Sequence, residues 1–348
     1  MDDDNLEQTT EQGDAEAQPE IAETEFVHIP VVRQLMVTLG ILVLVFGVTY
    51  MSTVVNILGG SEDTQGIMEA QVLPPVENVP TDIDADPFGT LTLRARAVYV
   101  WDVQNQRVIF KKNADEQLPL ASVTKLMTAL VAYELLGENA SVRISLDAIK
   151  QDGESGFLDG ELFNSQDLTD LTLITSSNDG AYALAATAGG SVSKTDTGAS
   201  TFVHAMNIRA KDIGLTQTYF SNPTGLDISP SVGGAYGSAR DMAFLMEYII
   251  TRYPEVIELT KEDYTKIANE NGETHEAENT NTTVSEIPGL IASKTGYTEL
   301  AGGNLIIAFQ AGLNRPIIIA VLGSTQNGRF SDIRALASAA QKFVTPDN

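Results

Sequence analysis

The chain has 348 residues, with 47 Asp and Glu against 21 Lys and Arg, three His and no Cys, and its formal net charge is −26. A chain without Cys forms neither a disulfide framework nor a thiolate metal site, and one this acidic repels nucleic-acid phosphate, so we expect no nucleic-acid partner. The length allows one large domain or two small ones.

Residues 1–33 hold ten acidic residues and one basic residue, Arg33, and have few apolar side chains before Phe26. A segment of this composition cannot bury enough apolar surface to fold alone, which predicts a disordered acidic tail. An acidic docking peptide is the alternative interpretation of the same residues.

The segment 34–58 is mostly apolar and has no charged residue. About 20 apolar residues span a bilayer, so this length predicts a transmembrane anchor. A cleaved signal peptide is the alternative, but the apolar run exceeds the ~7–15 residues of such a peptide and no Ala-x-Ala-like site follows. Arg33 precedes the span and no basic residue follows it before Arg94. This bias predicts a single-pass protein with a cytoplasmic N-terminus and the rest of the chain on the outer (periplasmic or cell-wall) side of the cell membrane.

Residues 59–90 carry seven acidic residues, four prolines and no basic residue, which predicts an extended acidic linker. Residues 91–348 have 30 acidic and 20 basic residues, an ordinary balance for a soluble globular domain. We therefore expect the folded domain at 91–345.

The domain begins with alternating apolar residues that turn at Gln104–Asn105, which predicts a hairpin of strands at 94–102 and 106–111. From residue 116 to residue 285 the pattern is mostly helical, with polar, Gly-rich breaks. The first helix is expected at Ser122–Leu136, ending before Gly137. Further helices are expected at 167–176, 178–188, 199–213 and 238–251.

The last third of the domain returns to strands. The segments GLIASKTG, GGNLIIAFQAG and PIIIAVLGS predict three strands, followed by an amphipathic helix at 329–344. Strands at both ends with helices between them imply an α+β domain: one antiparallel sheet built from both chain ends, flanked by helices, with an inserted helical subdomain.

Histidine chemistry has few candidates, because only His28, His204 and His275 are present. His28 precedes the predicted anchor, His204 lies in a predicted helix, and His275 lies in a polar run. None stands near a nucleophile turn, and a zinc site is equally poorly supplied. If the protein is a hydrolase, we expect a base other than histidine and no metal.

A lysine is the alternative to histidine as the base, and it occurs in the segment Ser122-Val123-Thr124-Lys125. Residues three apart on a helix share a face, so Ser122 and Lys125 are expected to be neighbours. The helix is apolar nearly all round, so Lys125 would be buried near the positive helix end, and both effects favour a neutral amine. A neutral Lys125 amine beside the Ser122 hydroxyl could act as a general base that activates the serine as a nucleophile. The alternative is that Lys125 reaches solvent from the first turn. A second Ser-x-x-Lys, starting at Ser191, shows that the motif alone is weak.

Two further motifs separate these interpretations. Ser176-Ser177-Asn178 lies at the junction of two predicted helices, and Lys294-Thr295-Gly296 lies on a predicted strand. Each occurs once in the chain. Ser-x-x-Lys, Ser-x-Asn and Lys-Thr-Gly in this order are the motif set of penicillin-binding proteins and serine β-lactamases. Their joint occurrence by chance is very small.

With these motifs, the segments LPLASVTKLMTALVAYELL, LTDLTLITSSNDGAYALA, FVHAMNIRAKDIGLTQTYFSNPTGLD, YGSARDMAFLMEYII and IASKTGYTELAGGNLIIAF resemble the D-alanyl-D-alanine carboxypeptidases, low-molecular-weight penicillin-binding proteins of the S11 peptidase type. The resemblance covers about 91–345. It implies a β-lactamase/transpeptidase-like fold, no cofactor, a peptidoglycan stem peptide ending in D-Ala-D-Ala as substrate, and β-lactams as covalent inhibitors.

The resemblance also implies the roles of the motif residues. Ser122 would attack the penultimate D-Ala carbonyl and Lys125 would take its proton. Ser176 would relay a proton to the leaving D-Ala, and Asn178 would bind the substrate backbone. Residues of the predicted strand would bind the substrate. Lys294 and Thr295 would hold its terminal carboxylate, Gly296 would let the substrate lie against the sheet edge, and the N–H groups of Ser122 and Tyr297 would form an oxyanion hole.

Two features depart from the family pattern. Ser177 stands where Ala or Gly is more usual and is interpreted as a polar filler, and Ala292-Ser293 replaces a Gly–apolar pair before the Lys-Thr-Gly motif. Two alternative functions stay open. A serine β-lactamase shares the acylation residues, but no Glu-x-x-Leu-Asn element stands between the second and third motifs. A membrane-tethered penicillin-sensing receptor would need an output domain, for which 33 acidic residues are too few.

Overall fold

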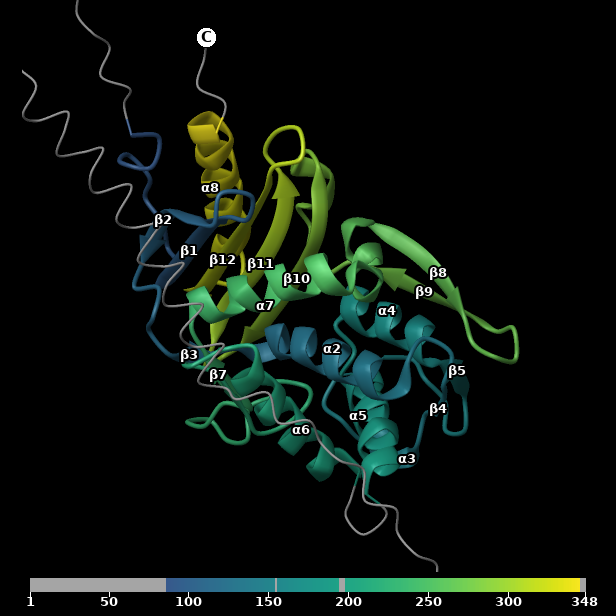
Figure 1. The fold of residues 1–348 in the computed structure, drawn as a ribbon. Helices are drawn as coiled ribbons and strands as arrows, with labels where there is room; N and C mark the ends of the chain where they lie inside the picture. The colour runs from purple at the N-terminus through teal and green to yellow at the C-terminus, as the bar shows by residue number, and fades with distance from the viewer. Residues whose placement is uncertain (1–85, 154, 194–197, 345–348) are drawn as a thin grey trace, which may run out of the picture. The chain divides into compact units, whose positions relative to one another are not determined.

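The computed structural model of the protein describes residues 86–153, 155–193 and 198–344 (Figure 1). The predicted acidic tail 1–33, the predicted anchor 34–58 and the predicted linker up to residue 85 lie outside these residues. Among the helices of the described ranges, none is long and apolar enough to cross a bilayer.

One five-stranded antiparallel sheet is built from both ends of the described chain, in the order β10-β11-β12-β1-β2. Ala97 near the start of this region pairs with Leu322 near its end. The predicted α+β architecture, with a helical region inserted between the two parts of the sheet, is confirmed. The strands are β1 (Ala97–Asp102), β2 (Arg107–Lys112), β10 (Leu290–Thr298), β11 (Gly302–Gln310) and β12 (Pro316–Ser324).

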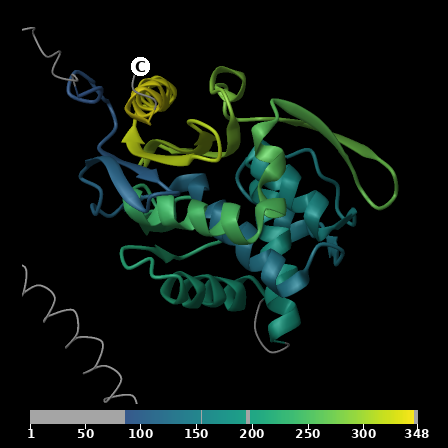
Figure 2. The ribbon, with the colours of Figure 1, turned by 45° about the horizontal axis from the view of Figure 1, so that its top comes forward.

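Side chains of this sheet enter two separate apolar cores, because successive residues of a strand point to opposite faces. Trp101 belongs to the core on the side of α7 (Ala239–Arg252), and Val100 belongs to the core on the side of α8 (Gly328–Val344). Figure 2 shows α8, in yellow, and α7, in green, on opposite faces of the sheet. Since both faces of the sheet are covered, the sequences of β11 and β12 are almost continuously apolar. Each buried aliphatic side chain contributes roughly 1.5–3 kcal/mol to the stability of the fold.

The inserted region is centred on α2, which packs against α4, α5, α6 and α7 (Figure 1). Every residue from Lys125 to Ala132 is buried, as expected of a helix that is apolar on all sides. The helices are α2 (Lys125–Leu136), α3 (Leu146–Ile149), α4 (Ser165–Thr175), α5 (Asn178–Val192) and α6 (Gly198–Asp212), with 3₁₀ turns η1 (Ala121–Thr124), η2 (Pro254–Val256), η3 (Glu258–Lys261) and η4 (Val284–Glu286).

Short strands complete this region, and the sequence pattern did not predict them. β3 (Leu118–Pro119), β6 (Tyr219–Phe220) and β7 (Ala235–Gly237) form one small sheet, while β4 (Ser141–Arg143) pairs with β5 (Leu162–Asn164). With two or three residues each, such strands are too short to show a period.

The prediction of mostly helical structure up to residue 285 is wrong for the hairpin of β8 (Tyr264–Ala268) and β9 (Thr274–Glu278). Each strand buries one apolar side chain, Ile267 or Ala277, so the alternation is too weak to recognise. The Asn271-Gly272 pair in its turn is a hairpin signal that the periodicity obscures.

Two predicted boundaries also change. The first helix does not begin at Ser122: η1 holds this residue in a tighter 3₁₀ turn, and α2 starts at Lys125. The linker does not extend to residue 90, because Phe88 is buried and its ring stacks on Phe110 at a centroid distance of 5.1 Å. Residues 86–90 are therefore part of the fold.

Candidate active site

Ser122 lies in the turn η1, where the chain passes from β3 into α2. The preceding residue, Ala121, has a φ of 48°, which is uncommon for a residue with a Cβ and is held here by its surroundings. The N–H of Leu120 donates to the carbonyl of Ala235 in β7 at 3.0 Å. The small sheet therefore fixes the turn that presents the serine, whose side chain is only half-buried.

The nitrogen Nζ of Lys125 lies close to three oxygens: 2.9 Å from Ser122 Oγ, 2.7 Å from Asn178 Oδ1 and 2.8 Å from the carbonyl of Thr224. The Lys125 side chain is fully buried, which rules out the alternative in which it reaches solvent. Because burial disfavours the charged form, the pKa of Lys125 falls to about 7.

A neutral amine suits these three contacts. The amide oxygen of Asn178 and the carbonyl of Thr224 can only accept hydrogen bonds, so they take the two N–H hydrogens of a neutral Lys125. The lone pair of the nitrogen is then left for Ser122, whose hydroxyl can donate. This is the arrangement of a general base and its nucleophile.

We expect the acylation rate of Ser122 by a penicillin to rise about tenfold per pH unit below pH 7 and to level off above it. The reason is that Lys125, with a pKa of about 7, accepts a proton only in its neutral form. Stopped-flow acylation between pH 5 and pH 9 measures this profile. A rate that is flat over this range, or that falls as the pH rises to 7, would contradict the role of Lys125 as base.

The second motif lies at the junction of α4 and α5. Ser176 has a left-handed backbone, with a φ of 62°, which ends α4 and turns its side chain toward Lys294 Nζ at 2.8 Å. Asn178 opens α5; its Oδ1 accepts from Lys125, and its Nδ2 donates to the carbonyl of Asp152 at 2.5 Å. Both polar ends of this amide are thus engaged within the protein, whereas the resemblance assigned it to the substrate backbone.

Ser177, between these two residues, is not a mere polar filler. Its hydroxyl accepts from the N–H of Gly180 at 2.9 Å and so caps the N-terminus of α5. It also donates to the hydroxyl of Ser155 at 2.7 Å. Ser177 therefore fixes the start of the helix that carries Asn178.

The third motif lies on β10, the edge strand of the sheet. The N–H of Ser293 donates to Thr260 Oγ1 at 3.0 Å, away from β11. Since alternate residues of an antiparallel strand direct their N–H groups to the same side, those of Thr295 and Tyr297 also face the open edge. An open edge can bind an extended peptide as an added strand.

Gly296 is required by a close approach within the protein. A Cβ at this position would lie 2.9 Å from the carbonyl oxygen of Leu120 and 3.1 Å from the backbone nitrogen of Ser122. We expected glycine at this position to leave space for the substrate. The structure gives a different reason, which is that the strand contacts the turn that carries Ser122. This contact brings the backbone of β10 beside that of Ser122.

Three buried basic side chains gather here without an acidic partner among the described residues. Lys125, Lys294 and Arg329 are at most 7% exposed, and none takes part in an ion pair among the described residues. Burial, with smaller contributions from Lys125 and Arg329, holds the pKa of Lys294 well below its usual value. Because an unpaired buried charge is costly, the site is suited to an anionic ligand.

Three residues of the site were missed by the sequence analysis. Arg329, at the start of α8, donates through Nη1 to the carbonyl of Gly296 at 2.7 Å. Asn304 of β11 donates to the carbonyls of both Pro119 and Leu120 at 3.0 Å and thereby holds the nucleophile turn against the sheet. Isolated polar residues in a helix and an apolar strand carry no motif, so nothing in the local sequence marks them.

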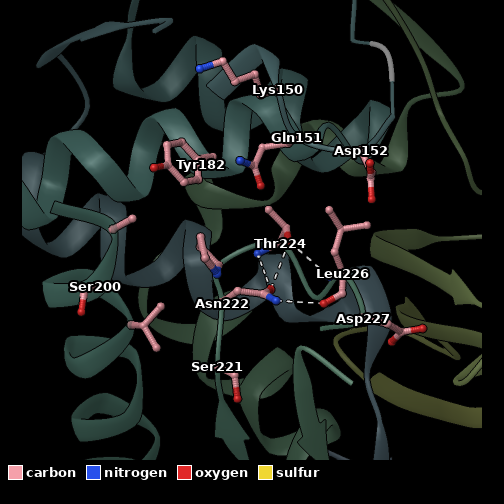
Figure 3. A pocket seen from close by; sticks show the side chains of 13 residues that line it. Lys150, Gln151, Asp152, Tyr182, Ser200, Ser221, Asn222, Thr224, Leu226 and Asp227 are labelled. Carbon is pink, nitrogen blue, oxygen red and sulfur yellow. Dashed lines mark hydrogen bonds between the residues drawn. The ribbon is translucent and has the colours of Figure 1, made fainter. Parts of the chain in front are cut away.

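Asn222 is the third such residue. It lines a pocket of about 500 Å³ with Thr224 and Asp152, whose carbonyls bind Lys125 and Asn178 (Figure 3). Its Oδ1 accepts from the N–H of Thr224 at 3.2 Å and its Nδ2 donates to the carbonyl of Leu226 at 2.8 Å. Asn222 thus stiffens the turn that presents the Thr224 carbonyl to Lys125.

The other candidates lie elsewhere. His275 Nε2 is 3.4 Å from Glu161 Oε1, and the imidazole packs in one cluster with the rings of Phe157 and Phe163. His204 is exposed on α6. His28 lies outside the described residues. The described ranges contain no group of three or more His, Asp and Glu side chains that could hold a metal ion.

The antiparallel sheet, the inserted helices and the three motifs between them define a protein of the penicillin-binding class. The fold is similar to that of a D-alanyl-D-alanine carboxypeptidase from Mycobacterium tuberculosis, with a TM-score of 0.63, 25% identity, and coverage of 72% of this chain and 92% of that one. It is also similar to penicillin-binding protein D2 from Listeria monocytogenes in its ampicillin-bound form, with a TM-score of 0.58, 29% identity and coverage of 72% and 98%.

Residues 83–326 match the peptidase S11 family, described as D-alanyl-D-alanine carboxypeptidase, and the chain belongs to this family. It is 31% identical over 265 residues to the D-alanyl-D-alanine carboxypeptidase DacF of Bacillus subtilis, covering 74% of this chain. The chain spans 64% of the length of that relative.

Proposed function

We propose that the protein is a serine-type D-Ala-D-Ala carboxypeptidase that removes the terminal D-Ala of peptidoglycan stem peptides. The observation that carries this proposal is the buried Lys125 amine, 2.9 Å from the hydroxyl of Ser122 and with a pKa of about 7. It gives a serine nucleophile a base of which a large fraction is neutral near pH 7, in a family of D-alanyl-D-alanine carboxypeptidases.

In acylation, Ser122 attacks the carbonyl of the penultimate D-Ala and Lys125 takes the serine proton. The N–H groups of Ser122 and Tyr297 bind the oxyanion; elsewhere one such donor contributes about 3 kcal/mol. The C–N bond breaks as Ser176 relays to the leaving nitrogen the proton that Lys125 took from Ser122, so that Lys125 and Ser176 both return to their starting protonation states. What supports Ser176 here is its hydroxyl at 2.8 Å from Nζ of Lys294, a residue of the third motif.

The terminal carboxylate of the peptide supplies the missing counter-ion. Lys294 and Thr295 lie in the middle of β10, Arg329 contacts the Gly296 carbonyl of the same strand, and Lys294 and Arg329 are buried basic side chains without an acidic partner among the described residues. A carboxylate bound there gains charge-assisted hydrogen bonds. It also places the scissile carbonyl, one residue earlier, beside Tyr297 on an antiparallel added strand.

Water then hydrolyses the Ser122 ester and releases the shortened peptide. A β-lactam enters the same path, because its carboxylate and its reactive amide carbonyl match those of D-Ala-D-Ala, and its ring-opened ester stays on Ser122.

In the full chain, segment 34–58 would hold this domain to the cell membrane on the periplasmic or cell-wall side, as proposed from the sequence alone.

The test of this proposal uses purified residues 86–348 and a pentapeptide ending in D-Ala-D-Ala, with released D-Ala measured enzymatically. A fluorescent penicillin, followed by mass spectrometry of the adduct, reports the acyl-enzyme in parallel. We expect D-Ala release and an adduct on Ser122 that lasts for minutes or longer. Absence of D-Ala release rejects the carboxypeptidase, and an adduct that turns over within seconds indicates a β-lactamase instead.

A further inference from the structure

Thr280 lies between the second and third motifs and belongs to neither. Its hydroxyl is 2.6 Å from the hydroxyl of Thr295, the middle residue of Lys-Thr-Gly. Its N–H donates to the carbonyl of Ile174, two residues before Ser176, at 3.1 Å, and its hydroxyl lies 3.4 Å from the same carbonyl. Thr280 therefore connects the end of α4 to the middle of β10.

The segment that carries Thr280 is held firmly on both sides. Asn279 donates through Nδ2 to the carbonyls of Thr260 and Glu262 at 3.0 and 2.9 Å. Asn279 Oδ1 accepts from the N–H of Asn281 at 2.9 Å, and Asn281 Oδ1 accepts from the N–H of Thr283 at 3.0 Å. With its backbone fixed in this way, the Thr280 hydroxyl has few degrees of freedom besides rotation of its hydrogen.

Two arrangements of hydrogens satisfy these distances, because each hydroxyl has one hydrogen and two lone pairs. In the first, Thr295 donates to Thr280, and Thr280 donates to the Ile174 carbonyl. In the second, Thr280 donates to Thr295, and the hydrogen of Thr295 is free for a ligand. The second arrangement loses only the long 3.4 Å bond, since the Ile174 carbonyl keeps its bond from the Thr280 N–H.

We propose that Thr280 is a positioning residue that donates its hydroxyl hydrogen to Thr295 when the terminal carboxylate of the substrate binds. This donation turns the hydrogen of Thr295 toward the carboxylate and strengthens that bond, because linked hydrogen bonds polarise one another. The inference rests on the proposed function, in which Thr295 binds the carboxylate. It makes recognition of a free C-terminus depend on two threonines.

The experiment compares two pentapeptides, one ending in free D-Ala-D-Ala and one in its C-terminal amide, in wild type and variants. For Thr280→Val, we expect KM for the free acid to rise about tenfold, the usual effect of weakening one hydrogen bond to a charged group. We expect kcat to change less than twofold and the amide to be turned over as by wild type. Thr280→Ser, which keeps the hydroxyl, should behave as wild type.

Two further variants control for structural effects. Thr282→Val makes the same change at an exposed residue of the same segment and should alter neither substrate. In a Thr295→Val background, Thr280→Val should have little further effect on KM, because Thr280 acts on the carboxylate only through Thr295. Thermal unfolding checks each protein, and Thr280→Ala replaces Thr280→Val if the valine variant does not fold.

The inference is overturned if Thr280→Val slows both peptides equally, if Thr280→Ser is equally defective, or if the two threonine changes add fully. If wild type releases D-Ala and Thr280→Val has the same kinetic constants, only this inference is rejected, and the proposed function stands. Wild type that releases no D-Ala rejects the proposed function and, with it, this role of Thr280.

Discussion

Replacing Ser122 by alanine is expected to abolish penicillin labelling and to lower the rate of D-Ala release by a factor on the order of 10⁵–10⁶. The reason is that no covalent intermediate forms without the hydroxyl, and the Lys125 amine 2.9 Å away is left with no proton to take. Because Ser122 is half-buried in a 3₁₀ turn, its loss should not prevent folding. Enzymatic detection of D-Ala and gel fluorescence of the penicillin adduct measure the two effects.

Ser191→Ala is the matched control, because Ser191 opens the second Ser-x-x-Lys of the chain and its hydroxyl donates only to the Ala188 carbonyl of its own helix in the described structure. This variant should label and turn over like wild type. If Ser122→Ala releases D-Ala at the wild-type rate, the covalent mechanism is wrong.

Replacing Lys125 by methionine is expected to slow acylation of Ser122 about 10³-fold, within the usual range of 10²–10⁴ for a positioned base. Methionine fills a similar volume but cannot accept the serine proton. It also leaves Asn178 Oδ1 and the Thr224 carbonyl without the donors that Lys125 provides at 2.7 and 2.8 Å. The acylation rate with a fluorescent penicillin, measured from pH 5 to pH 9, should also lose its rise toward pH 7.

Lys111→Met makes the same change on β2, the opposite edge of the sheet from β10, where the side chain is exposed. It should leave both the rate and its pH profile unchanged. Retention of the wild-type pH profile by Lys125→Met would show that another group takes the proton.

The motif residues could be predicted from the sequence because their spacing along the chain determines which side chains become neighbours. Ser122 and Lys125 lie one helical turn apart, so their contact at 2.9 Å follows from local geometry. An apolar helix predicts burial, and burial predicts the lowered pKa of Lys125. The sheet from both chain ends could be predicted as well, since long apolar strands such as β11 and β12 leave little choice of structure.

The supporting residues could not be predicted, because their partners are distant in the chain. Asn304 contacts carbonyls about 185 positions earlier, and Thr280 contacts Ile174 and Thr295. Each is a single polar residue whose local neighbours give no sign of its partner. The need for glycine at position 296 likewise could not be predicted. It arises because the turn that carries Ser122 lies against β10 in the folded chain.

The pairing of β1 with β12 has a consequence for the order in which the protein can fold. Ala97 and Leu322 meet across the whole inserted helical region, so closing the sheet requires contacts of very high sequence separation. Such contacts slow folding, because the loop between them must be ordered before they form. During synthesis, β1 is made first but gains its second neighbour almost last. Until then this edge of β1 and its side chains on the α8 side, such as Val100, are uncovered, and a chain truncated before residue 316 would keep this aggregation-prone edge permanently.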